Sequence, residues 1–597
     1  MPNMEKVRPG STLRVANCSG FYGDRLSAAK EMVEGGPIDV LTGDYLAELT
    51  MAILWRAYSR DRTAGYAASF VTQIEEVLGT CLDRGIKIVS NAGGLNPRGL
   101  AERLGKLAAD LGLEPSIAVV DGDDLMPRLE TLMDEGHEFR HLDRGLPLRD
   151  SGVTPLTANA YLGGWGIKEA LDRGADLVIC GRVTDAALVV GPCAWHYGWK
   201  RDEWDALAGA VVAGHIIECG PQATGGNYSF FQEVGSLDSP GFPIAEVASD
   251  GSSVITKHPG TGGRVTVGTV TAQLLYEIGS PRYLNPDVTS HFESIQLSQE
   301  DPDRVGVSNV KGSAPPPHLK VALNFLGGHR NSMTFGISGL DIDEKARVLE
   351  SALWKAVGGR EQFQTSEARL VRSTRPDPET IDDAMSYLRF TVKDPDPQKT
   401  GRGFSRGAVE LALSNYPGLF VTTPPGDASP YAVYWPTTIP AALVPMTVVV
   451  DNVETVVSSV APSGAEAPPP PAFFPRAGDH SSSKRRPLGV LVGARSGDKG
   501  GNANLGVWVR DSEAFPWLAS FLTVERLREL LPEAGTLPIA RFEMPNLLAL
   551  NFVIEGFLGE GVSSATATDP QAKSLGEFIR ARIVDIPAYL LTKTENR

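Results

Sequence analysis

A short stretch near the carboxyl end of this 597-residue chain combines charged, amide and glycine residues at high density. Arg495, Asp498 and Lys499 carry the charges, and Asn502 and Asn504 lie two positions apart, which on a strand puts them on the same side. Glycines at this density let the backbone turn sharply and approach a ligand closely. Arginine and lysine pair with phosphate or carboxylate groups, and an aspartate can orient them. The stretch predicts a ligand-binding or catalytic site, although a charged hairpin loop explains the same residues.

A second glycine-rich stretch, residues 257–264, carries a histidine between two cations. His258 can act as an acid or base near neutral pH, and Lys257 and Arg264 can hold an anion. A long hairpin turn is the alternative reading of this stretch.

The elements that position such residues begin with residues 1–220, where short apolar strands alternate with amphipathic helices. This alternation predicts an α/β domain with a parallel, Rossmann-like sheet that has helices on both faces. Ligands of such sheets bind beyond the carboxyl ends of the strands, where polar residues collect in this chain. We expect a ring of candidate residues along that edge, with Asp185 as a catalytic candidate. Its binding candidates are Asn17, Ser19, Gly20, Asp24, Asn91, Gly93, Gly94 and Arg182, beside Asp44, Asn96 and Asp121. A helix cap or turn explains any one of them alone.

The remaining chain predicts three further parts. Residues 221–457 mix short strands with one clear helix and indicate an α+β domain. Residues 458–485 are rich in proline and serine and indicate a linker. Residues 486–597 predict a small antiparallel sheet with two helices on one face, which is a ferredoxin-like arrangement.

Charge and composition exclude several classes of function. A net charge of -16 argues against nucleic acid as the main partner, because phosphate binding needs a basic face. No apolar run reaches the roughly 20 residues that cross a bilayer, and the first ten residues lack a signal-peptide core. The five cysteines are scattered without zinc spacing, which favours a cytoplasmic protein with reduced thiols.

A metal site is not predicted. The nine histidines are dispersed, and no HxH or HExxH pair occurs. The three aspartates of the segment 121–124 could hold Mg²⁺, but a loop that enters a helix N-terminus explains them equally well.

Five separate segments, in order, give the chain a resemblance to the acyclic terpene utilisation (AtuA) family. The segments are Ala16–Asp24, Thr42–Glu48, Ser90–Pro97, Gly181–Asp185 and Arg495–Gly500. The resemblance implies a large N-terminal region followed by a ferredoxin-fold C-terminal domain. It also implies a place in the breakdown of acyclic terpenes such as citronellol and geraniol, whose intermediates are branched acyl-CoA thioesters. It does not bring an established set of catalytic residues with it.

The main functional hypothesis is a cytoplasmic catabolic enzyme that acts on a branched or unsaturated acyl-CoA by hydratase or lyase chemistry. Asp498, Asp185 or His258 would supply the acid or base, and Lys499 and Asn502 would supply donors to the thioester oxygen. We expect a homo-oligomer that needs no cofactor beyond the CoA of its substrate. The alternatives are a nucleotide- or phosphate-dependent enzyme and a non-catalytic subunit of a carboxylase or hydratase assembly.

Overall fold

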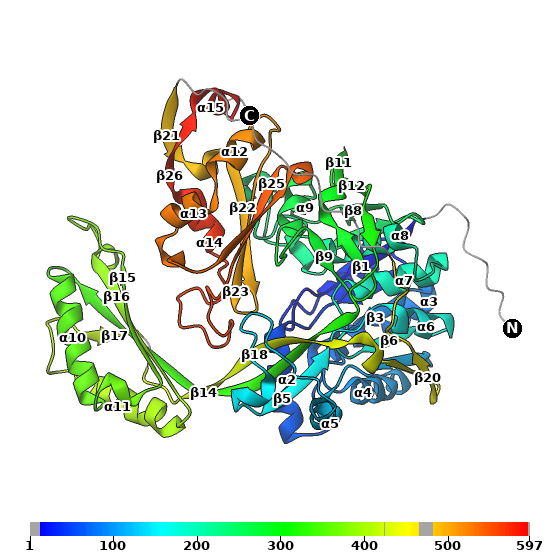
Figure 1. Ribbon diagram of the computed structural model, residues 1–597, viewed down its shortest axis with the longest axis horizontal. Coiled ribbons are helices and arrows are strands. Elements are labelled where there is room, and N and C mark those ends of the chain that lie inside the picture. Colours follow the sequence, from blue (N-terminus) through cyan, green and yellow to red (C-terminus); the bar gives the residue numbers. More distant parts are fainter. Residues whose placement is uncertain (1–11, 423, 465–481, 595–597) are drawn as a thin grey trace. The chain divides into compact units, whose positions relative to one another are not determined.

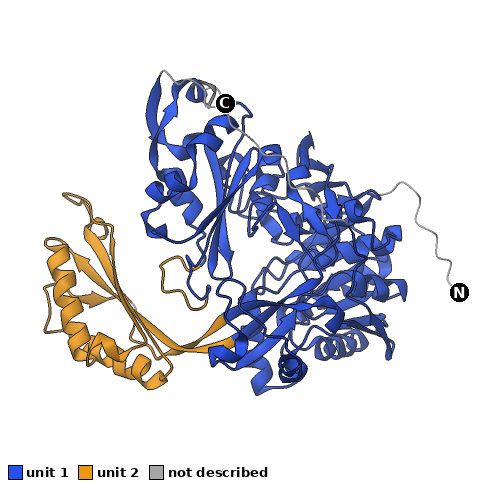
Figure 2. Cartoon of the chain, viewed as in Figure 1, with its two compact units in different colours: residues 1–324, 434–562, 571–597 blue, residues 325–433, 563–570 orange. Residues whose placement is uncertain are grey.

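The computed structural model describes residues 12–422, 424–464 and 482–594. The chain divides into two compact units, shown in Figure 2. Unit 1 comprises residues 1–324, 434–562 and 571–597, and unit 2 comprises residues 325–433 and 563–570. The central residues 465–481 of the predicted linker lie outside the described residues.

Within the described residues, unit 1 contains an 11-stranded sheet, in the order β11-β12-β8-β7-β1-β2-β3-β6-β4-β19-β20 (Figure 1). Its five middle strands are parallel: β1 (Leu13–Asn17), β2 (Val40–Gly43), β3 (Lys87–Ser90), β6 (Leu177–Cys180) and β4 (Ile117–Asp121). The outer strands are antiparallel: β7 (Pro243–Val247), β8 (Ser253–Lys257), β12 (Arg304–Ser308), β11 (Gln296–Asp301), β19 (Met446–Val450) and β20 (Val453–Val457).

Helices cover both faces of this sheet because both sets of alternating strand residues are apolar. Ala16, Leu41 and Ile88 belong to one core with α1 (Ala28–Glu34), α3 (Ala68–Arg84) and α4 (Pro97–Asp110). The alternate residues Val15 and Val40 are equally buried and point to the opposite face. The helices α6 (Trp165–Asp172), α7 (Ala187–Tyr197) and α8 (Trp204–Ile217) pack on that face.

The predicted parallel strands are present, but the sheet that contains them is mixed. β7 pairs antiparallel with β1, and β19 pairs antiparallel with β4, so strands from the predicted α+β domain complete the N-terminal sheet. For this reason the boundary predicted after residue 220 does not separate two compact units. The hydrophobic pattern indicates a buried strand but not the direction in which a later strand joins it.

Further elements of unit 1 connect the sheet to the rest of the chain. Helix α2 (Glu48–Arg60) follows β2, and β5 (Pro155–Ala160) pairs with the start of β14 (His318–Ser338). The others are α5 (Leu129–Asp134), α9 (Val267–Leu274) and a 3-stranded sheet of β13 (Lys311–Ser313), β10 (Thr289–His291) and β9 (Arg282–Leu284).

Unit 2 is an antiparallel sheet with helices packed on it. The end of β14 pairs with β16 (Met385–Asp394) and with β17 (Phe420–Val421), and β15 (Thr365–Arg372) lies on the other side of β16. Helices α10 (Ile342–Ala356) and α11 (Phe404–Val409) bury Leu349 and Phe404 against Phe335 and Phe390 of the sheet. The chain returns to unit 1 along β18 (Ser429–Pro440).

The C-terminal part of unit 1 is a 4-stranded antiparallel sheet in the order β22-β23-β25-β24. Its strands are β22 (Val492–Lys499), β23 (Asn502–Val509), β25 (Ala549–Ile554) and β24 (Ile539–Met544). Helices α12 (Phe515–Phe521), α13 (Val524–Leu530) and α14 (Leu575–Ala581) share one hydrophobic core with it. A separate pair, β21 (Ser483–Pro487) and β26 (Ile583–Pro587), precedes α15 (Ala588–Thr594). The two predicted helices, α13 and α14, are present, and α12 was not predicted.

Candidate functional site

The glycine-rich stretch near residue 500 forms a β-hairpin. β22 and β23 pair so that Asp498 lies opposite Ala503 and Lys499 lies opposite Asn502. Gly500 follows Lys499 with a φ of 63°, the left-handed conformation that tight hairpin turns require. Asp498 and Lys499 are therefore held at the end of a regular strand and not in a long loop.

One face of this hairpin packs closely on residues 275–279. A Cβ atom at Gly497 would lie 2.3 Å from the ring of Tyr276, and one at Gly506 would lie 2.4 Å from Cβ of Leu275. Neither distance is compatible with a side chain, so both positions need glycine for this approach. The glycines predicted to bring a ligand close instead bring another part of the chain close.

Polar groups of the same hairpin face fix the backbone of this segment. Asn504 Oδ1 accepts the N–H of Glu277 at 2.8 Å, and Lys499 Nζ donates to the Glu277 carbonyl at 3.0 Å. Asn551 on β25 donates to the carbonyl of Gly279 at 2.7 Å. The hairpin and residues 275–279 are thus joined by hydrogen bonds that place Glu277 beside Lys499.

Arg182 and Asp185 form an ion pair just after β6. The Arg182 guanidinium donates to Asp185 Oδ1 at 2.8 Å and lies 4.1 Å from the ring centroid of Tyr161. The Arg182 side chain is 4% exposed and that of Asp185 is 32% exposed. The backbone N–H of Arg182 also donates to buried Asp123 at 3.0 Å. A buried arginine needs such partners, and they fix its orientation.

Lys320 reaches the same place from the start of β14. Its carbonyl accepts the N–H of Tyr161 at 2.9 Å. Its ammonium group lies 4.9 Å from the Tyr161 ring centroid and 5.7 Å from that of Tyr434. It also lies 3.6 Å from the carboxylate of Glu48, the first residue of α2. Three segments distant in sequence therefore meet around one lysine.

Asp44 lies at the carboxyl end of β2 and is oriented by Asn91 from the end of β3. Asn91 Nδ2 donates to Asp44 Oδ1 at 2.6 Å, and its Oδ1 accepts the N–H of Tyr45 at 2.8 Å. The N–H of Leu46 also donates to Asp44 Oδ1, at 3.1 Å. Asn91 is thus a positioning residue for Asp44, which it holds at the predicted edge of the sheet.

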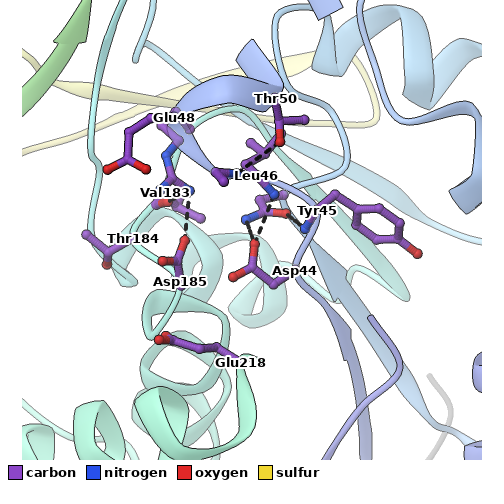
Figure 3. A network of polar contacts seen from close by, with 12 residues as sticks. Asp44, Tyr45, Leu46, Glu48, Thr50, Val183, Thr184, Asp185 and Glu218 are labelled. Carbon is purple, nitrogen blue, oxygen red and sulfur yellow. Dashed lines mark hydrogen bonds and ion pairs between the residues drawn. The ribbon is translucent and has the colours of Figure 1, made fainter. Parts of the chain in front are cut away.

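Glu218 follows α8, and its Oε1 lies 3.0 Å from Nδ1 of His215. Glu218 Oε2 is buried and has no hydrogen-bond partner among the described residues. Figure 3 shows Glu218 beside Asp185, with Asp44 and Glu48 around them. Asn17 donates to the carbonyls of Ile217 and Glu218 at 2.7 and 3.0 Å, which fixes this end of the helix.

Charged residues from these segments influence one another and form what we term the acid–base cluster. Its members are Asp44, Glu48, Arg182, Asp185, Glu218, Glu277, Lys320, Asp498 and Lys499. Burial raises the pKa of Asp44, and the nearby charge of Asp185 raises it further. Burial, Asp185 and Glu277 together raise the pKa of Glu218. The cluster therefore holds several carboxyl groups that keep a proton more readily than ordinary ones.

Asp498 and Lys499 connect the hairpin electrostatically to this cluster. Burial first, then Glu277 and Glu48, raises the pKa of Asp498 to about 8. Burial lowers the pKa of Lys499, as does the neighbouring charge of Lys320. A carboxyl group with a pKa near neutrality can both donate and accept a proton under physiological conditions.

Solvent still reaches the cluster. The side chains of Glu48 and Lys320 are 30% and 39% exposed. Burial nevertheless has the largest effect on the pKa of Glu48, although Lys320 and other cations lower that pKa overall. Charged groups that are largely surrounded by protein but still accessible to solvent can contact a small molecule.

Several predicted binding residues have structural roles. Asp24 accepts the N–H groups of Gly20 and Arg25, both at 2.8 Å, so the carboxylate closes its own loop. The buried Ser19 hydroxyl donates to the Phe21 carbonyl at 3.1 Å. A Cβ at Gly93 would lie 2.5 Å from the Cys180 carbonyl, and Gly94 has a φ of 52°. These residues shape the edge of the sheet and orient their neighbours.

The other hairpin candidates contact different partners. Asn502 donates to Asp143 at 3.0 Å and accepts the N–H of Gly556 at 2.8 Å, so it ties the hairpin tip to two loops. Arg495 is 5% exposed and donates to Gln222 at 2.6 Å. Asp498 and Lys499 are thus linked to Arg182 and Asp185 through the charges of Glu48, Glu218 and Glu277, which both pairs influence or are influenced by.

His258 makes its contacts at helix α1. Its Nε2 lies 2.9 Å from the Met32 carbonyl, and its ring packs on Gly35 and Gly36. Burial lowers its pKa, while the bond to Met32 raises it. Lys257 from the same stretch pairs with Asp303 at 3.3 Å. The catalytic role expected for His258 finds no support in these contacts, which are those of a packed core histidine.

Glu48, Glu218, Glu277, Lys320 and Tyr434 are not among the site residues predicted from the sequence. Glu48 is the last residue of the segment Thr42–Glu48, which supports the family resemblance. That position is the only sequence feature here that could have indicated a role for Glu48. Lys320 interrupts the apolar run Leu319–Leu323, and an ion within a buried strand is a recognisable exception. Glu277 carried no local signal, because its place depends on how the hairpin packs.

Within the parts of the chain that the structure describes, no group of three or more His, Cys, Asp or Glu residues is arranged to hold a metal ion. Nor does any helix in those parts combine the length and apolar character needed to cross a membrane.

Comparison with known families matches most of the chain. The model of the acyclic terpene utilisation family protein AtuA matches residues 13–450. The model of the AtuA ferredoxin-like domain matches residues 486–585, which contain the hairpin, and confirms the ferredoxin-like assignment of this part. A search of curated proteins gave no significant match.

Proposed function

Because the chain belongs to the acyclic terpene utilisation (AtuA) family, we propose that it is an enzyme of acyclic terpene breakdown. The proposed substrate is a branched or unsaturated acyl-CoA thioester, and the proposed chemistry is that of a hydratase or lyase. One observation carries this proposal: the hairpin residues Asp498 and Lys499 share a cluster with Arg182 and Asp185 from the edge of the large sheet.

Hydration of an unsaturated thioester needs a base, an acid and a positive group near the carbonyl oxygen. Asp185 is proposed to accept a proton from water, whose oxygen then adds to the β-carbon. The electron pair of the double bond moves onto the thioester, and the carbonyl oxygen gains negative charge. Asp498 then donates its proton to the α-carbon. The pKa of about 8 supports this role, since it keeps Asp498 protonated at neutral pH.

Lys499, Lys320 and Arg182 are the candidates for stabilising the developing negative charge. Lys499 uses one donor on the Glu277 carbonyl, which leaves its other N–H groups for a ligand. Arg182 is rigidly held by Asp185 and the ring of Tyr161, so it would act without reorganising. Elimination and carbon–carbon cleavage next to a thioester develop the same charge and would use the same groups.

The experiment is turnover of a panel of branched α,β-unsaturated acyl-CoA thioesters, followed by loss of the conjugated absorbance and by mass spectrometry. Wild type is expected to hydrate at least one member of the panel. Asp498→Asn is expected to lower kcat by roughly 10²–10⁴-fold, the usual contribution of a positioned acid or base. Lys106→Met, at an exposed position of α4, is the matched control and should leave kcat unchanged.

Absence of turnover for every thioester, with correctly folded protein, would contradict the proposal. Turnover that survives in Asp498→Asn would contradict the role of the cluster but not the substrate class. Activity that appears only on adding a carboxylase or hydratase partner would favour the non-catalytic subunit.

The nucleotide-dependent alternative has less support from the contacts. This alternative places the phosphate at the loop Ser19–Asp24 after β1 and at the loop Asn91–Asn96 after β3. At the first of these loops the N–H groups of Gly20 and Arg25 already donate to Asp24, so they are not free to bind phosphate.

A further inference from the structure

A cavity of about 330 Å³ lies within unit 1, beside the edge strand of the small sheet. Its walls come from β22, from the start of α14 and from the segment 227–237. Its volume is at the lower end of the range for small-molecule sites, roughly 300–1,000 Å³. The polar and aromatic groups that line it include Arg495, Ser496, Lys573, Asn227, Tyr228 and Phe231.

Arg495 is a buried cation whose contacts are neutral. It is 5% exposed, donates to the amide oxygen of Gln222 at 2.6 Å, and stacks 4.1 Å from the ring centroid of Tyr276. Among the described residues, no carboxylate forms an ion pair with Arg495 within 4.0 Å, and burial lowers the pKa of this arginine, an effect that the charge of Glu277 only partly offsets. A buried charge without a paired counter-charge is costly, and an anion in the adjoining cavity would offset that cost.

Lys573 adds a second positive charge at the exposed side of the cavity. Its ammonium group lies 5.9 Å from the Tyr276 ring, on which Arg495 also stacks. The carboxylate that lines the cavity, Glu577, is already paired with Arg580 at 2.6 and 2.9 Å. The two cations are therefore not neutralised by the acid beside them, and the cavity favours a negative ligand.

We propose that this cavity binds the anionic group of a small molecule, a phosphate or carboxylate, between Arg495 and Lys573. Arginine offers paired donors in a plane and lysine a mobile point charge, and together they suit an oxyanion. The exposed ring of Phe231 at the cavity would contact an attached flat or apolar group.

The cavity adjoins the acid–base cluster. Ser496 lines it, and Asp498 lies two residues further along the same strand, on the same face. Lys573 is close enough to lower the pKa of Asp498, against the larger effects of burial, Glu277 and Glu48. A ligand anchored here would extend toward Asp498. That this anion is part of the substrate rests on the function proposed above, whereas binding of the anion itself does not.

The test is isothermal titration calorimetry of the full-length protein at low salt with inorganic phosphate, inorganic diphosphate and acetate as separate probes. Wild type is expected to bind at least one probe saturably. Lys573→Met should weaken that binding by about tenfold, the equivalent of one charge-assisted hydrogen bond. Lys573→Arg should largely retain it, and Lys106→Met should not change it. Arg495→Met should also weaken binding, with circular dichroism used to check that it folds.

Preference for phosphate or diphosphate would assign a phosphoryl group, and preference for acetate would assign a carboxylate. No saturable binding by wild type, or equal binding by wild type and Lys573→Met, would overturn the inference. The calorimetry does not measure turnover, so it tests the anion site independently of the proposed reaction. Anion binding without thioester hydration would contradict the proposed reaction but support the anion site. Thioester hydration without anion binding would support the proposed reaction but contradict the anion site.

Discussion

At the scale of single residues, the proton affinity of Asp498 arises from its neighbours. Burial removes the water that would stabilise its charge, and Glu277 and Glu48 add repulsion, which raises its pKa to about 8. The same aspartate in an unfolded chain releases its proton near pH 3.9. The folded state therefore binds one more proton than the unfolded state between these two values.

This difference predicts how pH affects stability. Since the folded state holds the extra proton, stability from this group falls as the pH rises from about 4 to about 8. Asp498→Asn removes the group, so the variant should melt above wild type at pH 8 and approach it at pH 5. We expect a gain of roughly 1–3 °C in Tm at pH 8. Asp110→Asn, at an exposed position of α4, should show no such trend. A lower Tm for Asp498→Asn across the whole range would contradict the raised pKa.

At the scale of elements, two glycines determine how the hairpin meets residues 275–279. Gly497 and Gly506 each face the segment at a distance that leaves no room for a methyl group. The hydrogen bonds of Asn504 and Lys499 to Glu277 depend on this close approach. The packing of two backbones, rather than a loop around a ligand, explains why the sequence is so rich in glycine here.

Gly497→Ala is expected to disturb this packing. Its added methyl group would meet the ring of Tyr276, and overpacking of this kind destabilises by about 1–3 kcal/mol. Urea denaturation measures the loss. Gly105→Ala in α4 is the control, since nothing lies within 4 Å of its Cβ position and alanine favours helix. Equal stability of Gly497→Ala and wild type would show that the hairpin does not pack as described.

The strands β1, β2, β3, β4 and β6 could be predicted because each is a short apolar run buried on both faces. That later antiparallel strands join the same sheet could not be predicted, since β7 and β19 carry no local sign of their partners. The hairpin was predicted as a loop because Arg495 to Lys499 lacks the apolar alternation of a strand.

The candidate site, like the fold, was predictable only in part from the sequence. Arg182 and Asp185 follow a buried strand, and Asp498 and Lys499 lie in an unusual motif, so their types and positions gave signals. Glu277 and Lys320 gave little, because their roles depend on contacts between segments far apart in sequence. Local patterns predict elements, whereas tertiary packing decides which charges meet.

At the scale of the whole molecule, residues from two sheets of unit 1 form the acid–base cluster. The large sheet contributes Asp44, Arg182 and Asp185 at its strand ends, and the small sheet contributes Asp498 and Lys499. The two family matches, at residues 13–450 and 486–585, divide the cluster in the same way. If the cluster is one site, a change in the first part must alter the titration of a residue in the second.

The pKa of Asp498, taken from pH-difference infrared spectra of wild type minus Asp498→Asn, tests this most directly. We expect a carboxyl titration at about 8 in wild type. In the Glu48→Gln background we expect a clearly lower value, because the repulsion of Glu48 is removed. A value near 4 in both proteins, as for an isolated surface aspartate, would contradict the existence of a shared site.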